Sequence, residues 1–151
     1  MSTASANRFV YVTYIRTTPQ QLWAALTSAD FTRQYWMGMR VEAEWRPGGS
    51  WRLLKPDGTL ADAGEIIECE PGKRLVIRWR HEMTPELKAE GWSQCTMDLE
   101  PVGNAVKLTV THRMEREGGR FIAAVAGGWP QVLSNLKSLL ETGSTLLPTR
   151  Y

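Results

Sequence analysis

Two histidines, His81 and His112, are the side chains of this sequence best suited to acid–base chemistry or metal binding. Apolar and polar residues alternate through 74–81 and 105–113, and strand geometry then directs both imidazoles to the apolar, inward face. A metal site needs a third ligand, and a catalytic pair needs a carboxylate that orients the imidazole. The inward faces offer neither at a convincing spacing. We therefore interpret both histidines as hydrogen-bonded residues of the core or of a pocket rim, and we predict no catalytic residues and no metal site.

The cysteines and the glycine pairs are the other groups that chemistry could use. Cys95 faces inward without basic residues near it, which is typical of inert packing. Cys69 and Cys95 lack metal-like spacing and no secretory leader precedes them, so we expect reduced thiols and a cytoplasmic protein. The glycine pairs at 48–49, 118–119 and 127–128 match no phosphate-loop pattern. We predict no cofactor.

The longest amphipathic segment, residues 128–143, must position such groups against a second layer. Its apolar residues recur at spacings of three and four, which predicts a helix with one buried face: Trp129, Val132, Leu133, Leu136, Leu139 and Leu140. The opposite face carries Ser134, Asn135, Lys137, Ser138 and Glu141. Leu136 should therefore be buried and Lys137 should face outward. Gly143 is suited to a left-handed C-terminal cap and predicts where the helix ends.

The residues before this helix predict a sheet that supplies the second layer. Segment 9–16 is typical of a first strand, and it is followed by two short helices, near 17–26 and near 30–36. Turn sequences then separate six more expected strands, near 40–45, 49–55, 60–69, 74–81, 92–100 and 105–113. Connections this short favour antiparallel neighbours, so the pattern predicts a meander and a two-layer α+β fold.

Two stretches interrupt this regular pattern. Segment 82–91 carries a Thr-Pro-Glu sequence that could begin a one-turn helix, and it could act as a lid, although an irregular loop is the simpler interpretation. Gly127, Gly128 and Pro130 stand together in the approach to the last helix. We expect a kink or a break there.

Composition limits the partners of the chain. With 151 residues and 42% hydrophobic content it should form one domain, 8–146, after a flexible tail, 1–7. The net charge of +2 comes from 18 basic and 16 acidic residues that are interspersed, which argues against nucleic acid. No apolar run approaches the roughly 20 residues of a membrane span, so we expect no membrane insertion. Seven tryptophans indicate an aromatic core or an aromatic-lined cavity.

Five motifs together resemble the activator-of-heat-shock-protein-90-ATPase homologue family of the START-like, helix-grip (SRPBCC) superfamily. They are YIRTTPQQLWAALT, YWMG, GGSW, GEIIECEPGKRLVIRW and GWPQVLSNLKSLLETG, and the resemblance covers nearly all of 8–146. It implies a curved seven-stranded antiparallel sheet wrapped around a long C-terminal helix, with two short helices after the first strand. It also implies a cavity between helix and sheet for an apolar or aromatic small molecule.

Three functions remain open from the sequence. The first is a module that binds a small hydrophobic or aromatic ligand, in a cavity lined by Trp36, Trp51, Leu53, Trp79, His81, Met97, His112, Phe121, Val125, Trp129 and Val132. The second is a cyclase-like or hydrolase-like enzyme that uses His81 or His112 as acid or base. The third is an interaction module that regulates a chaperone ATPase. A homodimer is left open in each case.

Overall fold

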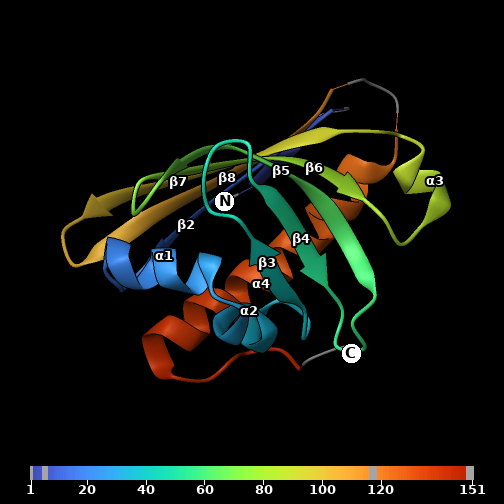
Figure 1. The fold of residues 1–151 in the computed structure, drawn as a ribbon. Coiled ribbons are helices and arrows are strands. Elements are labelled where there is room, and N and C mark those ends of the chain that lie inside the picture. Colours follow the sequence, from blue (N-terminus) through green and yellow to red (C-terminus); the bar gives the residue numbers. More distant parts are fainter. Residues whose placement is uncertain (1, 5–6, 116–118, 149–151) are drawn as a thin grey trace.

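One curved antiparallel sheet forms the frame of the protein (Figure 1). The computed structural model describes residues 2–4, 7–115 and 119–148, and within them the sheet has eight strands. Their order across the sheet is β1 (Ser2–Ala4), β2 (Arg8–Ile15), β8 (Ala105–Met114), β7 (Ser93–Val102), β6 (Arg74–His81), β5 (Leu60–Glu70), β4 (Ser50–Leu54) and β3 (Arg40–Ala43). Apart from the step from β2 to β8, neighbours in space are neighbours in sequence, as expected for a meander.

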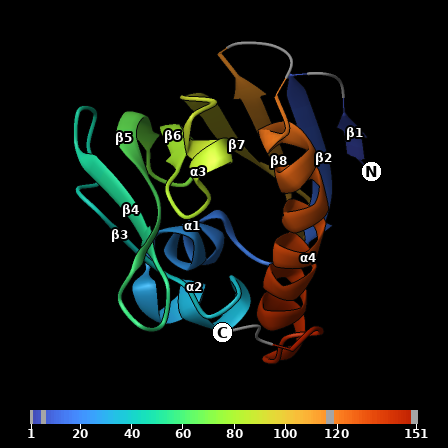
Figure 2. The same cartoon turned by 90° about the vertical axis from the view of Figure 1, so that its right-hand side faces the viewer.

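The helices cover the concave side and the two ends of this sheet. They are α1 (Pro19–Thr27), α2 (Ala29–Tyr35), α3 (Pro85–Lys88) and α4 (Phe121–Thr142). The sheet curves from β2, beside α4, round to β3 and β4 on the far side of α2 (Figure 2). The short helices α1 and α2 lie at one end of α4, and α3 lies at the other (Figures 1 and 2). This is the predicted helix-grip arrangement.

Local signals place the start of α1 and the end of α4 where the sequence predicts them, whereas α4 begins at Phe121, before the predicted segment 128–143. The Thr18 hydroxyl oxygen accepts a hydrogen bond from the Gln21 backbone N–H at 3.2 Å, and Pro19 occupies the first turn of α1. Gly143 is left-handed, with φ of 88°, and its N–H donates to the Leu139 carbonyl. Segment 82–91, for which an irregular loop was the simpler interpretation, contains the one-turn helix that its Thr-Pro-Glu sequence allowed, α3.

The first residues of the chain correct one expectation. Ser2–Ala4, predicted to belong to a loose tail, pair with β2 as the additional strand β1. Without them β2 would be an edge strand with unpaired N–H and C=O groups, and such groups favour pairing with a further strand. Asn7, the last residue of the predicted tail, accepts a hydrogen bond from the Met114 N–H at 2.8 Å, and residues 1 and 5–6 lie outside the described residues.

Helix α4 is continuous through 22 residues, so of the kink or break expected near Pro130 the break is absent. Proline removes one hydrogen bond, the one that the Ala126 carbonyl would accept, and its ring crowds that turn. Gly127 and Gly128 lie in open space within the same turn, and the Gln131 side-chain amide donates to the Gly127 carbonyl at 3.0 Å. None of the described helices is long and apolar enough to cross a membrane.

The apolar face of α4 packs as predicted, with Leu136 fully buried. Lys137 is partly exposed, yet its Nζ donates to the Tyr14 carbonyl on β2 and to Glu141 Oε2 at 2.8 Å. Asn135 corrects the predicted polar face, because it is buried. Its Oδ1 accepts from the Leu147 N–H at 2.7 Å, so it fixes the segment that folds back after α4.

The inward residues of the sheet agree with the predicted alternation. Leu75, Ile77 and Trp79 on β6 are buried in the core, and so is Cys95, where burial raises the pKa of the thiol. Val76 is an exception: it lies on the other face of β6 and is buried too, although outside the main hydrophobic cluster.

Candidate functional site: an aromatic cavity with a polar end

A cavity of about 160 Å³ lies between α4 and the strands β5 and β6, and α3 and the turn after α2 border it. Apolar side chains predominate in its wall. The lining residues are Trp36, Met37, Met39, Asp62, Trp79, His81, Leu87, Phe121, Ala124, Val125, Gly128, Trp129 and Val132. A mostly apolar wall with a few polar groups is typical of a small-molecule site.

Three tryptophans from distant parts of the chain meet in the wall of this cavity. The ring of Trp36 lies 5.1 Å from that of Trp129 and 6.0 Å from that of Trp79. Trp79 and Trp129 are 5.9 Å apart, in an edge-on arrangement. Trp51 lies behind Trp79 at 4.3 Å, with the two rings tilted by 41°. Tilted and edge-on contacts at these distances are favourable for aromatic rings, so the cluster holds the cavity wall in a defined shape.

The turn after α2 brings further side chains into the cavity. Met37 has φ of 53°, and among the described residues it is the only residue other than glycine with a positive φ. Such a conformation costs about 1–2 kcal/mol. Backbone strain of this kind clusters at ligand sites, and here it places Trp36, Met37 and Met39 in the same wall.

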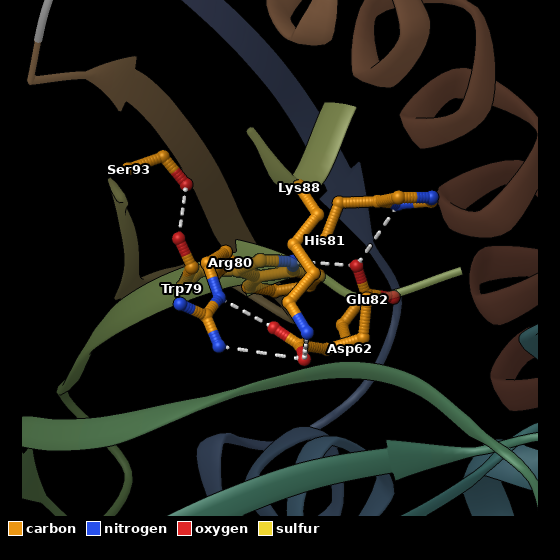
Figure 3. Close-up of polar contacts among 7 residues, drawn as sticks. All are labelled: Asp62, Trp79, Arg80, His81, Glu82, Lys88 and Ser93. Atoms are coloured by element: carbon orange, nitrogen blue, oxygen red, sulfur yellow. Dashed lines mark hydrogen bonds and ion pairs between the residues drawn. The ribbon is translucent and has the colours of Figure 1, made fainter. Parts of the chain in front are cut away.

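The polar end of the cavity consists of Asp62, Trp79 and His81 (Figure 3). The Trp79 indole N–H donates to Asp62 Oδ1 at 3.0 Å, and His81 Nδ1 lies 3.4 Å from the same oxygen. Both the His81 and Asp62 side chains are largely buried, at 13% and 9% exposure. His81 Nε2 is fully buried and has no hydrogen-bond partner in the part of the chain that the structure describes.

The Asp62 carboxylate contradicts the expectation that the inward faces supply no carboxylate for a histidine. Asp62 is directly opposite His81 in the register of β5 and β6, just as Gly64 is opposite Trp79 and Ile66 is opposite Ile77. The buried Ile66 therefore assigns Asp62 to the inward face by strand alternation. This signal was present in the sequence and was missed.

His112 has a different environment, behind the cavity wall. The Trp129 indole N–H donates to His112 Nδ1 at 3.1 Å, so this nitrogen carries no proton. His112 Nε2–H then donates to the Ser93 hydroxyl at 2.8 Å, and that hydroxyl donates to the Trp79 carbonyl at 3.0 Å. Every polar atom of this buried chain has a partner while the imidazole is neutral, and burial lowers the pKa of His112 to about 3.

The segment that contains α3 is anchored over the cavity, where Leu87 contributes to the wall. The Glu90 carboxylate accepts hydrogen bonds from the backbone N–H groups of Arg120 at 2.8 Å and Phe121 at 3.0 Å. A carboxylate at a helix N-terminus satisfies free N–H groups and complements the helix dipole. At the other end of the segment, Lys88 pairs with Glu82 at 3.2 Å.

The structure brings together some of the predicted site residues and separates others. Seven line the cavity: Trp36, Trp79, His81, Phe121, Val125, Trp129 and Val132. The other four, Trp51, Leu53, Met97 and His112, are buried in the core and do not line it. Six lining residues were not predicted: Met37, Met39, Asp62, Leu87, Ala124 and Gly128. In the described residues no group of three or more potential ligands could hold a metal ion.

Comparison with known proteins identifies relatives of this chain. The family model described as activator of Hsp90 ATPase homolog 1-like protein matches residues 16–141. None of the curated proteins matches the sequence.

Solved structures have the same fold. A protein from the dynemicin biosynthetic locus, DynU16, is 24% identical with a TM-score of 0.76, over 97% of this chain and 51% of that one. The Aha1 dimer from Colwellia psychrerythraea is 20% identical with a TM-score of 0.72, over 90% and 97% of the two chains. An HSP90 activator from Plasmodium falciparum is 22% identical with a TM-score of 0.71, over 89% and 96%.

Proposed function

The chain belongs to the family of activator of Hsp90 ATPase homolog 1-like proteins, and from this membership and its cavity we propose that it binds a small apolar or aromatic molecule. The observation that carries the proposal is the cavity between α4 and the sheet. This cavity opens to solvent on one side, so a small molecule can enter it, and concave sites with mostly apolar walls are where proteins bind small molecules. The wall is built from aromatic rings and methionines, which favour an apolar ligand.

The volume limits the size of the ligand. A dry apolar cavity of roughly 150 Å³ holds a molecule of the size of benzene, whereas drug-sized ligands occupy roughly 300–1,000 Å³. At about 160 Å³, this cavity accommodates one aromatic ring with small substituents. A larger ligand would require α3 to move away from the cavity.

A second candidate function, acid–base catalysis on the bound molecule, is favoured by the position of Asp62. A carboxylate beside one imidazole nitrogen, with the other nitrogen free, is the arrangement of a general base. The structure describes no nucleophile hydrogen-bonded to His81, so we place ligand binding ahead of catalysis as the proposed function.

The chaperone-regulating alternative rests on the family relation, because no surface feature of the described residues identifies a chaperone site. The Colwellia relative is a dimer, so we also propose a homodimer for this chain, which light scattering would test.

Two neighbouring glycines of α4 provide a matched test of the cavity. Gly128 lines it and Gly127 does not, and a Cβ atom at either position would meet no atom within 4 Å. In Gly128→Leu the new side chain occupies the cavity, and in Gly127→Leu it points elsewhere. We expect toluene, titrated by calorimetry, to bind the wild type and Gly127→Leu alike and to bind Gly128→Leu at least about tenfold more weakly, because overpacking is costly. Absence of toluene binding to the wild type, or equal binding to all three proteins, would contradict the proposal.

A further inference from the structure

We propose that the ligand of this cavity carries a hydroxyl group, as a phenol does, and that His81 Nε2 accepts the hydrogen bond of this hydroxyl. The inference rests on the proposed binding function and adds the chemical class of the ligand. Asp62 acts as a positioning residue, which holds the imidazole in the tautomer that can accept.

The register of the sheet fixes the pair. Asp62 and His81 are directly opposite each other on β5 and β6, so their side chains leave the same face of the sheet. Asp62 Oδ1 lies 3.0 Å from the Trp79 indole nitrogen and 3.4 Å from His81 Nδ1. An indole nitrogen only donates, so Trp79 holds the carboxylate in place from one side. A carboxylate oxygen facing Nδ1 favours the tautomer with the proton on Nδ1.

The second imidazole nitrogen then carries a lone pair. Almost none of its surface is exposed, so a ligand hydroxyl reaches it when the His81 ring turns toward the cavity that it lines. In Figure 3 the outer nitrogen of His81 points away from Asp62, toward the side of α4. The nearest ring on that side is Phe121, 6.4 Å from the imidazole between centroids, which offers no hydrogen-bond donor. Of all buried side-chain nitrogen and oxygen atoms in the described residues, His81 Nε2 alone has no partner. A buried unsatisfied acceptor is costly, and a donor on the ligand would remove this cost.

The wall around this nitrogen selects the kind of donor. A carboxylate on the ligand would be repelled by Asp62. An ammonium group would need several acceptors to replace its water, and the wall consists mostly of apolar side chains. The indole N–H groups of Trp79 and Trp129 are already bonded to Asp62 and His112. A ligand with a single neutral hydroxyl on an aromatic ring fits both requirements, because the hydroxyl can donate to His81 and the ring can contact the apolar wall.

Phenol and toluene are a matched pair for the test, because they differ only in a hydroxyl against a methyl group. A purely apolar cavity would favour toluene, the less well hydrated of the two. We expect the wild type to bind phenol at least about fivefold more tightly than toluene, and we expect His81→Leu to reverse this order, since the acceptor is lost. His81→Gln, whose amide oxygen also accepts, should retain part of the preference for phenol.

The outcomes separate this inference from the function on which it rests. If toluene binds the wild type as well as phenol does, or if His81→Leu keeps the preference for phenol, the hydroxyl assignment is wrong while cavity binding stands. If neither molecule binds, both are wrong.

A measurement on the wild type avoids dependence on any variant. Long-range proton–nitrogen correlation spectra of the imidazoles distinguish the nitrogen that carries the proton. We expect His81 to carry it on Nδ1, and we expect phenol, but not toluene, to shift the Nε2 resonance. A proton on Nε2, or an Nε2 resonance that phenol does not move, would overturn the proposal.

Discussion

Acidification from pH 8 to pH 5 should destabilise this protein through His112. In the folded state its Nδ1 accepts from Trp129 and its Nε2–H donates to Ser93, an arrangement that requires the neutral imidazole. Protonation would place two N–H donors opposite each other at the Trp129 contact, inside the core. The rings in contact with His112 are Trp79, Phe121 and Trp129, none of which is charged.

The size of the effect follows from the linkage between protonation and folding. In the folded protein burial lowers the pKa of His112 to about 3, while in the unfolded chain it returns to the ordinary value of about 6.5. Between these values the unfolded state binds more protons, so the free energy of unfolding decreases as the pH falls. The stability is fully present above about pH 6.5. At pH 5 the loss is about 2 kcal/mol, since each unit below 6.5 contributes about 1.36 kcal/mol.

Urea melts at pH 8 and pH 5 would measure this loss, with His112→Gln as the test variant. The variant should be less stable at pH 8, because it leaves the Trp129 and Ser93 groups imperfectly paired, but it should lose about 2 kcal/mol less than the wild type on acidification. His81→Gln, which removes the only other histidine and leaves the partners of His112 in place, is the matched control. Carboxylates titrate mostly below this range, at about 4. Equal losses in the wild type and His112→Gln would refute the reasoning.

Three further predictions concern α4 and its neighbours. Leu136→Ala should cost about 2–5 kcal/mol of unfolding free energy in urea melts, and Lys137→Ala, whose bonds are at the surface, about 0.5–1 kcal/mol; equal midpoints would mean that α4 does not pack by its apolar face. Glu90→Ala should cost about 0.5–2 kcal/mol and speed hydrogen exchange at the first amides of α4, because the helix loses its cap; unchanged exchange there would show that this carboxylate does not cap the helix. Gly127→Ala and Gly128→Ala should each stabilise the protein by up to about 1 kcal/mol in thermal melts, since both positions are helical and open; destabilisation by either would contradict the open space at that position.

Much of the fold could be predicted because local signals are strong in this chain. All seven predicted strands are present, with ends displaced by at most a few residues, since alternation and turn sequences act locally. The strand β1 could not be predicted, because Ser2–Ala4 have no apolar pattern and pair only to complete an edge. The continuity of α4 was missed because a proline costs a helix one bond, and the packing of Trp129 and Val132 on the core outweighs it.

The candidate site was predictable in part, because strand alternation gives the face of a residue and not its depth. Trp51 and Leu53 face inward as expected, yet they pack into the core beside the cavity. Met37 could not be found at all from periodicity, since it reaches the cavity from a strained turn. Asp62 could have been found, because it lies four residues before the buried Ile66 on the same strand and so faces the same side of the sheet.

Both histidines lie on the inward face of their strands, but they have different roles. What distinguishes them is the number of hydrogen-bond partners of each imidazole. His112 on β8 has both nitrogens bonded: one accepts from the Trp129 indole and the other donates to Ser93 on β7, which donates to the Trp79 carbonyl. It therefore fixes the Trp129 ring of the cavity wall, although it does not line the cavity itself. His81 has one nitrogen beside a carboxylate and one, buried, without a partner among the described residues, so that nitrogen is the one a ligand can bond. Changes at His112 should thus alter ligand affinity through the shape of the wall, and for phenol and toluene alike, whereas changes at His81 should alter the choice between them.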